Sequence, residues 1–93
     1  MFERQIRRAL RRAERQFDRE WKFDRADQCE MLLADSSRFD AFVDRAKDET
    51  RRAYGVGEIG DGELLRMIFK WLFEDGGIMV LLDLFFAPNP ADA

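Results

Sequence analysis

The chain has 93 residues, enough for one small domain with a limited interior. It contains no histidine and a single cysteine, Cys29, which excludes within one chain a Cys/His zinc site, a Ser-His or Cys-His dyad and a disulfide. The net charge of −3 is uneven, because residues 1–22 carry eight basic and four acidic side chains, whereas residues 23–93 carry eight basic and fifteen acidic ones.

The sequence shows no targeting or membrane signal. A signal peptide requires an apolar segment after its charged start, and no such segment follows the first four residues. The longest apolar run is Ile78 to Leu82, far below the ~20 residues of a membrane span. With one cysteine and no such signal, we expect an intracellular, cytoplasmic protein.

Residues 2–23 are predicted to form one long amphipathic helix. Apolar residues recur there at spacings of three and four, and no glycine or proline interrupts them. The apolar stripe consists of Phe2, Ile6, Ala9, Leu10, Ala13, Phe17 and Trp21. The opposite face is charged and carries Arg4, Arg7, Arg8, Arg11, Arg12, Arg15 and Arg19.

A second, short helix is expected over residues 25–34. No strong breaker separates it from the first helix, so the two are either continuous or kinked near Asp24. Its inward residues are predicted to be Ala26, Cys29, Leu32 and Leu33, with Met31 filling a gap. A lone cysteine usually behaves as a small buried hydrophobe, although a Cys29–Cys29 bond between two chains is an alternative.

A third helix is expected to start in the segment Asp35-Ser36-Ser37. Ser37 and Asp40 have the spacing of a capping box. The helix should run to Tyr54 and end at Gly55, because glycine tolerates the left-handed conformation that follows a helix. Its predicted buried stripe is Phe39, Phe42, Val43, Ala46, Thr50 and Ala53.

Residues 55–62 are predicted to form an interhelical loop. Gly55 to Gly60 matches the pattern G-x-G-x-x-G, but a dinucleotide site requires this pattern after a strand and within a βαβ unit. Here it follows a helix, and no strand precedes it. We therefore expect a plain connection, with Asp61 capping the next helix.

The C-terminal part is unusually apolar. A helix is expected from Gly62 or Glu63 to Asp75, with only a narrow polar stripe, so most of its surface should be buried. Residues 78–86 are either a helix or a short buried strand, and we favour the helix because no partner strand is visible. Pro88 should stop it, and the tail should be frayed.

The sequence therefore predicts an all-α fold, a compact bundle of four or five helices opened by the long N-terminal one. We expect a single domain over residues 1–93. Within it, residues 1–54 form amphipathic helices, 55–62 the glycine-rich loop, 63–87 an apolar helical hairpin and 88–93 the tail.

Two sets of carboxylates have spacings that would permit cation binding. These are Asp40, Asp44 and Asp48 on the third helix, and Glu58, Asp61 and Glu63 in and after the loop. Neither set matches the twelve-residue calcium loop, and basic residues accompany the first. We expect solvated surface here, with no metal, no cofactor and no enzymatic activity.

The apolar C-terminal half predicts an interface. A chain of this size can bury one helix that is apolar all round but not readily two, and monomers seldom expose large apolar patches. We therefore expect a non-enzymatic assembly or structural role, in a homo-oligomer or as a subunit of a larger complex. The expected anchors are Trp71, Phe73, Leu81, Phe85 and Phe86.

The alternative is an anion-binding module that uses the basic face of the first helix to bind nucleic acid or an anionic membrane surface. A pI of about 5.0 and the interspersed acidic residues favour instead a solvated face, or one that meets the chain's own acidic half. The candidate residues are Arg4, Arg8, Arg11, Arg15 and Arg19.

Overall fold

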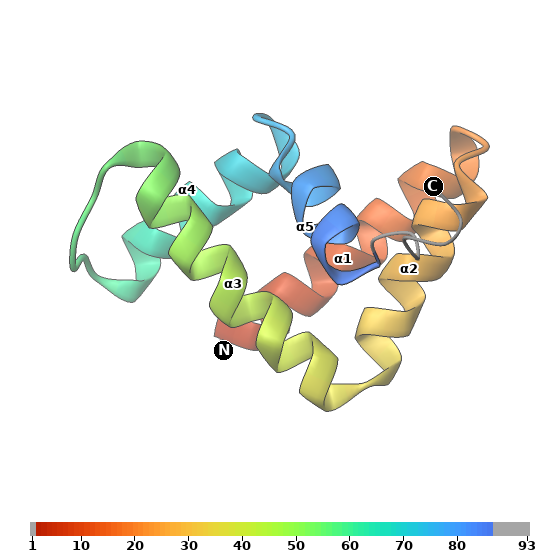
Figure 1. Cartoon of the computed structure of the whole chain (residues 1–93), viewed down its shortest axis with the longest axis horizontal. Coiled ribbons are helices and arrows are strands. Elements are labelled where there is room, and N and C mark those ends of the chain that lie inside the picture. The colour runs from red at the N-terminus through yellow and green to blue at the C-terminus, as the bar shows by residue number, and fades with distance from the viewer. Residues whose placement is uncertain (1, 87–93) are drawn as a thin grey trace. The chain divides into compact units, whose positions relative to one another are not determined.

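The computed structural model describes residues 2–86, and over this range it contains five α-helices and no strand (Figure 1). The prediction of an all-α fold with four or five helices is confirmed. The predicted frayed tail, residues 88–93, lies outside the described residues. The helices are α1 (Phe2–Arg19), α2 (Phe23–Ala34), α3 (Ser36–Tyr54), α4 (Asp61–Phe73) and α5 (Gly77–Phe85).

The chain divides into two compact units, residues 1–43 and residues 44–93. The boundary falls inside α3, where the apolar pattern of the sequence shows no break. The first unit holds α1, α2 and the beginning of α3, and the second holds the remainder of α3 with α4 and α5.

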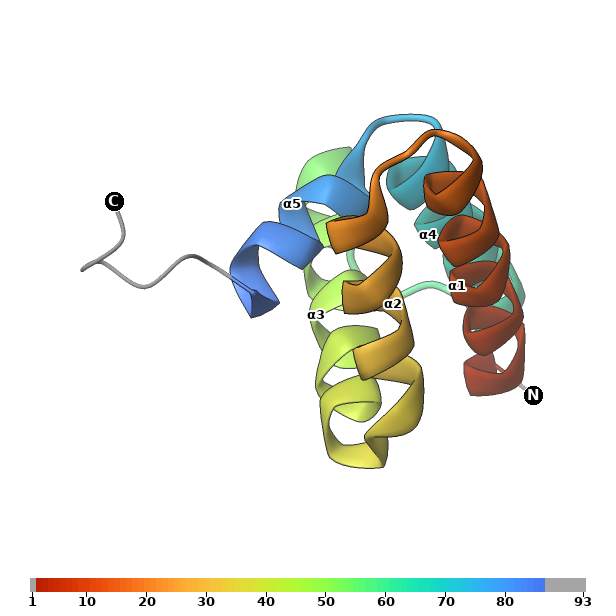
Figure 2. The same cartoon turned by 90° about the vertical axis from the view of Figure 1, so that its right-hand side faces the viewer.

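In the first unit, α1 and α2 form a hairpin and pack against each other (Figure 2). α1 ends at Arg19, four residues earlier than the sequence predicted. The backbone N–H of Trp21 donates to the Asp18 carbonyl at 3.1 Å, and that of Lys22 donates to the Phe17 carbonyl at 2.8 Å. These bonds turn the chain, so the first two helices are separate rather than continuous.

The apolar stripe of α1 packs inward as expected. Ile6, Leu10, Ala13 and Phe17 are buried, and so are Ala26, Cys29 and Leu32 of α2. Met31 was expected to fill a gap but is 47% exposed, because it lies on the face of α2 opposite to Cys29 and Leu32.

The N-terminus of α3 is capped by Asp35. Its carboxylate accepts hydrogen bonds from the backbone N–H groups of Ser37 at 3.0 Å and Arg38 at 3.2 Å. These two donors have no partner within the helix, so an acidic cap satisfies them and complements the helix dipole. The cap therefore lies two residues before the predicted Ser37.

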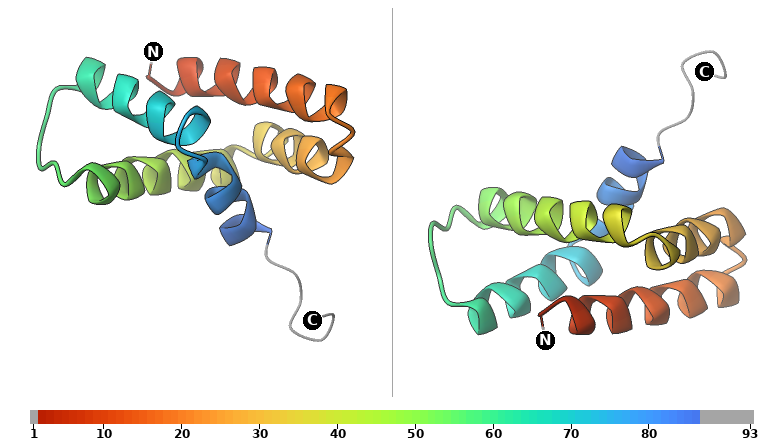
Figure 3. Two further views of the ribbon diagram at one scale, coloured as in Figure 1. Left: turned by 90° about the horizontal axis from the view of Figure 1, so that it is seen from above. Right: turned by 90° about the horizontal axis from the view of Figure 1, so that it is seen from below.

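α3 is one uninterrupted helix that leads into the loop before α4 (Figure 3). The predicted stripe is buried from Phe39 to Thr50, but Ala53 in the last turn is exposed. Gly55 follows with φ of 63°, which confirms its role after the helix terminus.

In the second unit, α4 and α5 pack against each other. α4 buries Leu64, Ile68, Trp71 and Leu72. Its N-cap is Gly60 rather than Asp61, which is the first helical residue.

The segment predicted over residues 78–86 is a helix rather than a strand, as favoured, and it ends at Phe85. A tight turn places Gly76 in the left-handed region with φ of 80°, and α5 starts at Gly77. Ile78, Leu81 and Leu82 form the buried face of α5.

Candidate functional site

The five apolar anchors expected from the sequence occupy different environments. Trp71 and Leu81 are only 8% and 0% exposed, so they belong to the interior and offer no surface to a second chain. Phe73 is 43% exposed, whereas Phe85 and Phe86 are half-buried. Of the five expected anchors, therefore, only Phe73, Phe85 and Phe86 are at least partly accessible at the surface.

An apolar surface that the sequence reasoning missed lies on α5. Val80 and Leu84 are 56% and 48% exposed, and they are four residues apart, so they share one side of the helix. We call this pair the α5 outer face. At 100° per residue both positions lie on the side away from Ile78 and Leu82, but the sequence of this apolar helix does not indicate which side is buried.

A second apolar contact lies on α4. The rings of Phe69 and Phe73 are four residues apart with centroids separated by 6.3 Å. Phe69 is half-buried and Phe73 is exposed, so this pair extends from the interior to the surface.

The charged face of α1 forms one continuous basic surface, which we call the arginine strip. All six of its arginines are exposed, and their helical angles lie within about 100° of each other, opposite the buried stripe. None forms a salt bridge with a described residue. The arginine strip consists of the five predicted residues and one more: Arg4, Arg8, Arg11, Arg12, Arg15 and Arg19.

Arg7 does not belong to the strip. Its Nη1 donates to the Leu33 carbonyl at 3.0 Å, and its guanidinium lies 4.2 Å from the centroid of the Phe39 ring. One side chain of α1 thus joins α2 and the first turn of α3 within the first unit. We assign Arg7 to the fold rather than to a binding surface.

The turn between α1 and α2 exposes two aromatic side chains. Trp21 is 80% exposed and Phe23 is 51% exposed, and their rings meet edge to face with centroids 5.7 Å apart. The sequence placed Trp21 on the inward stripe of the first helix, which is wrong. Trp21 follows Phe17 by four residues and so continues the apolar stripe. The apolar spacing therefore did not predict that the helix ends before Trp21.

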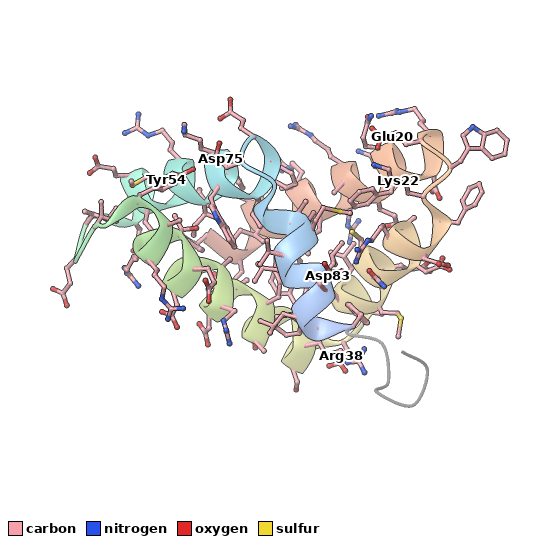
Figure 4. The ribbon with its side chains drawn as sticks, turned by 45° about the horizontal axis from the view of Figure 1, so that its top comes forward. Glu20, Lys22, Arg38, Tyr54, Asp75 and Asp83 are labelled. Atoms are coloured by element: carbon pink, nitrogen blue, oxygen red, sulfur yellow. The ribbon has the colours of Figure 1, made fainter. Side chains whose placement is uncertain are left out.

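The same turn carries an ion pair. Lys22 Nζ lies 3.3 Å from Glu20 Oε1, and the two side chains lie close together (Figure 4). Hydrogen bonds from Gln16 and Lys22 lower the pKa of the Glu20 carboxyl. A negative charge therefore persists beside Trp21.

A polar cluster links the C-terminus of α3 to the α4–α5 turn. The Tyr54 hydroxyl donates a short hydrogen bond to Asp75 Oδ2 (Figure 4), and Lys70 Nζ lies 3.5 Å from the same oxygen and 5.1 Å from the centroid of the tyrosine ring. Partial burial, this bond and the charges of Asp75 and Glu74 raise the pKa of Tyr54 to about 12. The bond from Tyr54 lowers the pKa of Asp75.

Other reactive groups are not arranged for chemistry. Cys29 is buried, and burial raises the pKa of its thiol to about 12, so it is protonated at neutral pH. Within residues 2–86, no three carboxylate or thiol side chains gather in a way that would hold a metal ion.

No family model matches this chain, and neither does any curated protein or solved structure. None of the helices between residues 2 and 86 is both long enough and apolar enough to cross a bilayer. A function must therefore be argued from the α5 outer face, the arginine strip and the aromatic turn.

Proposed function

We propose that this protein self-associates through the α5 outer face. The observation that carries the proposal is the composition of α5, which has one charged residue, Asp83, among nine. Its buried face accounts for Ile78, Leu81 and Leu82. The opposite side carries the exposed side chains of Val80 and Leu84 beside a single carboxylate, that of Asp83. Apolar residues on both sides of a helix are typical of a helix that is covered on both sides.

A second copy of the chain is the occupant we propose. Most soluble oligomers are homo-oligomers, and a twofold axis lets one patch pair with itself. Val80 and Leu84 offer such a self-complementary patch, because two copies of one helical face can pack antiparallel.

The test is the molar mass in solution. Size-exclusion chromatography with light scattering over a dilution series should give a dimer or larger species that dissociates on dilution. The double variant Val80→Ser/Leu84→Ser should shift the protein to monomer at every concentration while its helical circular dichroism persists, because both side chains lie outside the interior.

Met31→Ser is the matched control, because it removes an exposed apolar side chain from α2 and leaves α5 intact. It should not change the mass. If the unmodified chain is a monomer at the highest concentration, or if Met31→Ser dissociates it equally, self-association through the α5 outer face is refuted.

A second candidate function is polyanion binding by the arginine strip. The observation that favours it is that all six guanidinium groups lie on one exposed strip and none is paired with a carboxylate of a described residue. The strip runs for about 22 Å along α1 at 1.5 Å per residue. Phosphates spaced along a nucleic acid backbone are the natural partner of such an array.

The experiment compares two variants with the same change in charge. Arg8→Gln/Arg15→Gln removes two residues of the strip, whereas Arg45→Gln/Arg52→Gln removes two arginines of α3 that are both paired with Glu49. Only the first should weaken retention on heparin at low salt. It should also reduce the slope of log K against log salt by about 1.4 for a single-stranded polyanion. Equal losses would attribute binding to net charge, and no retention would remove the candidate.

A further inference from the structure

Trp21 occupies a conformation that is unfavourable for its side chain. Its φ is 62°, in the left-handed region, and it is the one non-glycine residue with positive φ in the part of the chain that the structure describes. For a bulky L-residue this conformation costs about 1–2 kcal/mol. Glycine avoids this cost and is the usual residue at such a position after a helix.

The interior gains little from this tryptophan. Its side chain is 80% exposed, so it buries little apolar area to offset the backbone strain. A strained backbone at a residue whose side chain is not buried in compensation points to a role outside folding.

Phe23 orients the indole. The edge-to-face contact at 5.7 Å, with an interplanar angle of 73°, restricts the ring while most of its surface remains open. A rigid, open aromatic ring is suited to stacking, because little side-chain entropy is lost when a second ring packs on it.

The arginine strip ends two residues before Trp21. Arg19 is the last residue of α1 and precedes Trp21 by two residues, which separates their Cα atoms by at most about 7 Å. At 3.4 Å per nucleotide, the 22 Å strip spans about six nucleotides of one strand. Cations for phosphates followed by an open aromatic ring for a base form the combination that binds single-stranded nucleic acid.

We propose that the first unit binds single-stranded nucleic acid, with phosphates on the arginine strip and an unpaired base stacked on Trp21. This inference rests on the proposed polyanion binding and adds the class of polyanion. Stacking requires an unpaired base, so a duplex engages the arginines alone. An anionic bilayer could also attract the arginines, but it offers no unpaired base to stack on Trp21, so the test below separates it from a single strand.

The probe is an oligothymidylate of about 12 nucleotides, within the usual site size of single-strand binders, at low salt. We expect binding to quench tryptophan emission, and we attribute the quenching to Trp21 because Trp71 is buried. Trp21→Gly should weaken binding about 5-fold to 150-fold, since stacking on an aromatic contributes about 1–3 kcal/mol per base. Trp21→Phe should restore most of the affinity.

Trp21→Gly is expected to fold, because glycine suits the left-handed turn and the removed ring is not part of the interior. Its thermal midpoint should match or exceed that of the unmodified chain. Its affinity for a duplex of equal length should be unchanged, because only the arginine strip contacts the duplex.

The failures of the two proposals differ. If Trp21→Gly binds oligothymidylate as tightly as the unmodified chain while Arg8→Gln/Arg15→Gln binds less tightly, stacking is refuted and polyanion binding stands. If neither single strand nor duplex binds at low salt, both are refuted. A blue shift of Trp21 emission on phosphatidylserine vesicles, without quenching by oligothymidylate, overturns the inference in favour of a membrane surface.

Discussion

In the second unit, the backbone at the start of α5 packs tightly against an aromatic ring. Gly77 is buried at the start of α5, and a Cβ built on it would lie 2.6 Å from the Cε2 and Cε3 atoms of Trp71. The indole is rigid and itself buried, so it cannot swing away at low cost. A glycine at this position is therefore required by packing rather than by its φ.

Gly77→Ala should destabilise the protein by about 1–3 kcal/mol, the usual cost of overpacking a close-packed interior. Gly62→Ala is the matched control, because Gly62 lies in the first turn of α4 with nothing within 4 Å of its added Cβ. That change should stabilise by up to about 1 kcal/mol through helix propensity. Urea titrations followed by circular dichroism measure both, and equal effects would contradict the packing argument.

The Tyr54–Asp75 hydrogen bond makes stability depend on pH at both extremes. The raised pKa of Tyr54 means that its contribution is fully present below the ordinary value of 10.0 and is lost as pH rises toward about 12. The lowered pKa of Asp75 means that the contribution of this carboxylate is present above 3.8 and is lost on acidification below that value. The bond should therefore stabilise the fold most between these two ordinary values.

Tyr54 is the chain's single tyrosine, so its tyrosinate absorbance can be titrated directly. The midpoint should lie near 12 in the folded protein and should fall toward 10.0 in Asp75→Ala. The stability difference between the unmodified chain and Tyr54→Phe should be constant near neutral pH and should vanish at both extremes. A tyrosine that titrates normally would refute this bond in solution.

At the scale of the elements, periodicity located the helices but not all of their ends. Apolar stripes with spacings of three and four predicted α1 and α3, and a narrow polar stripe in an otherwise apolar segment predicted α4. The break after Arg19 was missed because no glycine marks it, and a tryptophan occupies the left-handed position instead. The cap of α3 was predicted at Ser37, two residues after the actual cap Asp35, because Asp35, Ser36 and Ser37 are all residue types that can cap a helix.

The candidate surfaces were predictable to different degrees. Five residues of the arginine strip were identified from the sequence, because the apolar stripe fixes the buried face of α1 and the arginines opposite it must then be exposed. For α4 and α5 the sequence is apolar on nearly every side, so it does not indicate which side chains are buried. Trp71 and Leu81 were therefore expected at a surface but lie in the interior. Val80 and Leu84 were not singled out.

At the scale of the molecule, two units share one helix. Residues 1–43 and 44–93 are each near the size below which a chain seldom folds without help. The unit boundary leaves eight residues of α3 in the first unit and eleven in the second. Helices shorter than about 12 residues are marginal in isolation because nucleation is unfavourable. Neither part of α3 should persist when the other has unfolded.

We therefore predict that the two units unfold together, and the chain carries a natural probe in each. The buried thiol of Cys29 reports on the first unit through its reaction with an aromatic disulfide reagent, and the emission of buried Trp71 reports on the second. Trp21 is exposed before and after unfolding, so it adds little change. In urea, the two midpoints should coincide, as cooperative unfolding requires. Thiol reactivity appearing at lower urea than the change in Trp71 emission would mean that α3 can melt on one side of residue 43, and the units would then be independent.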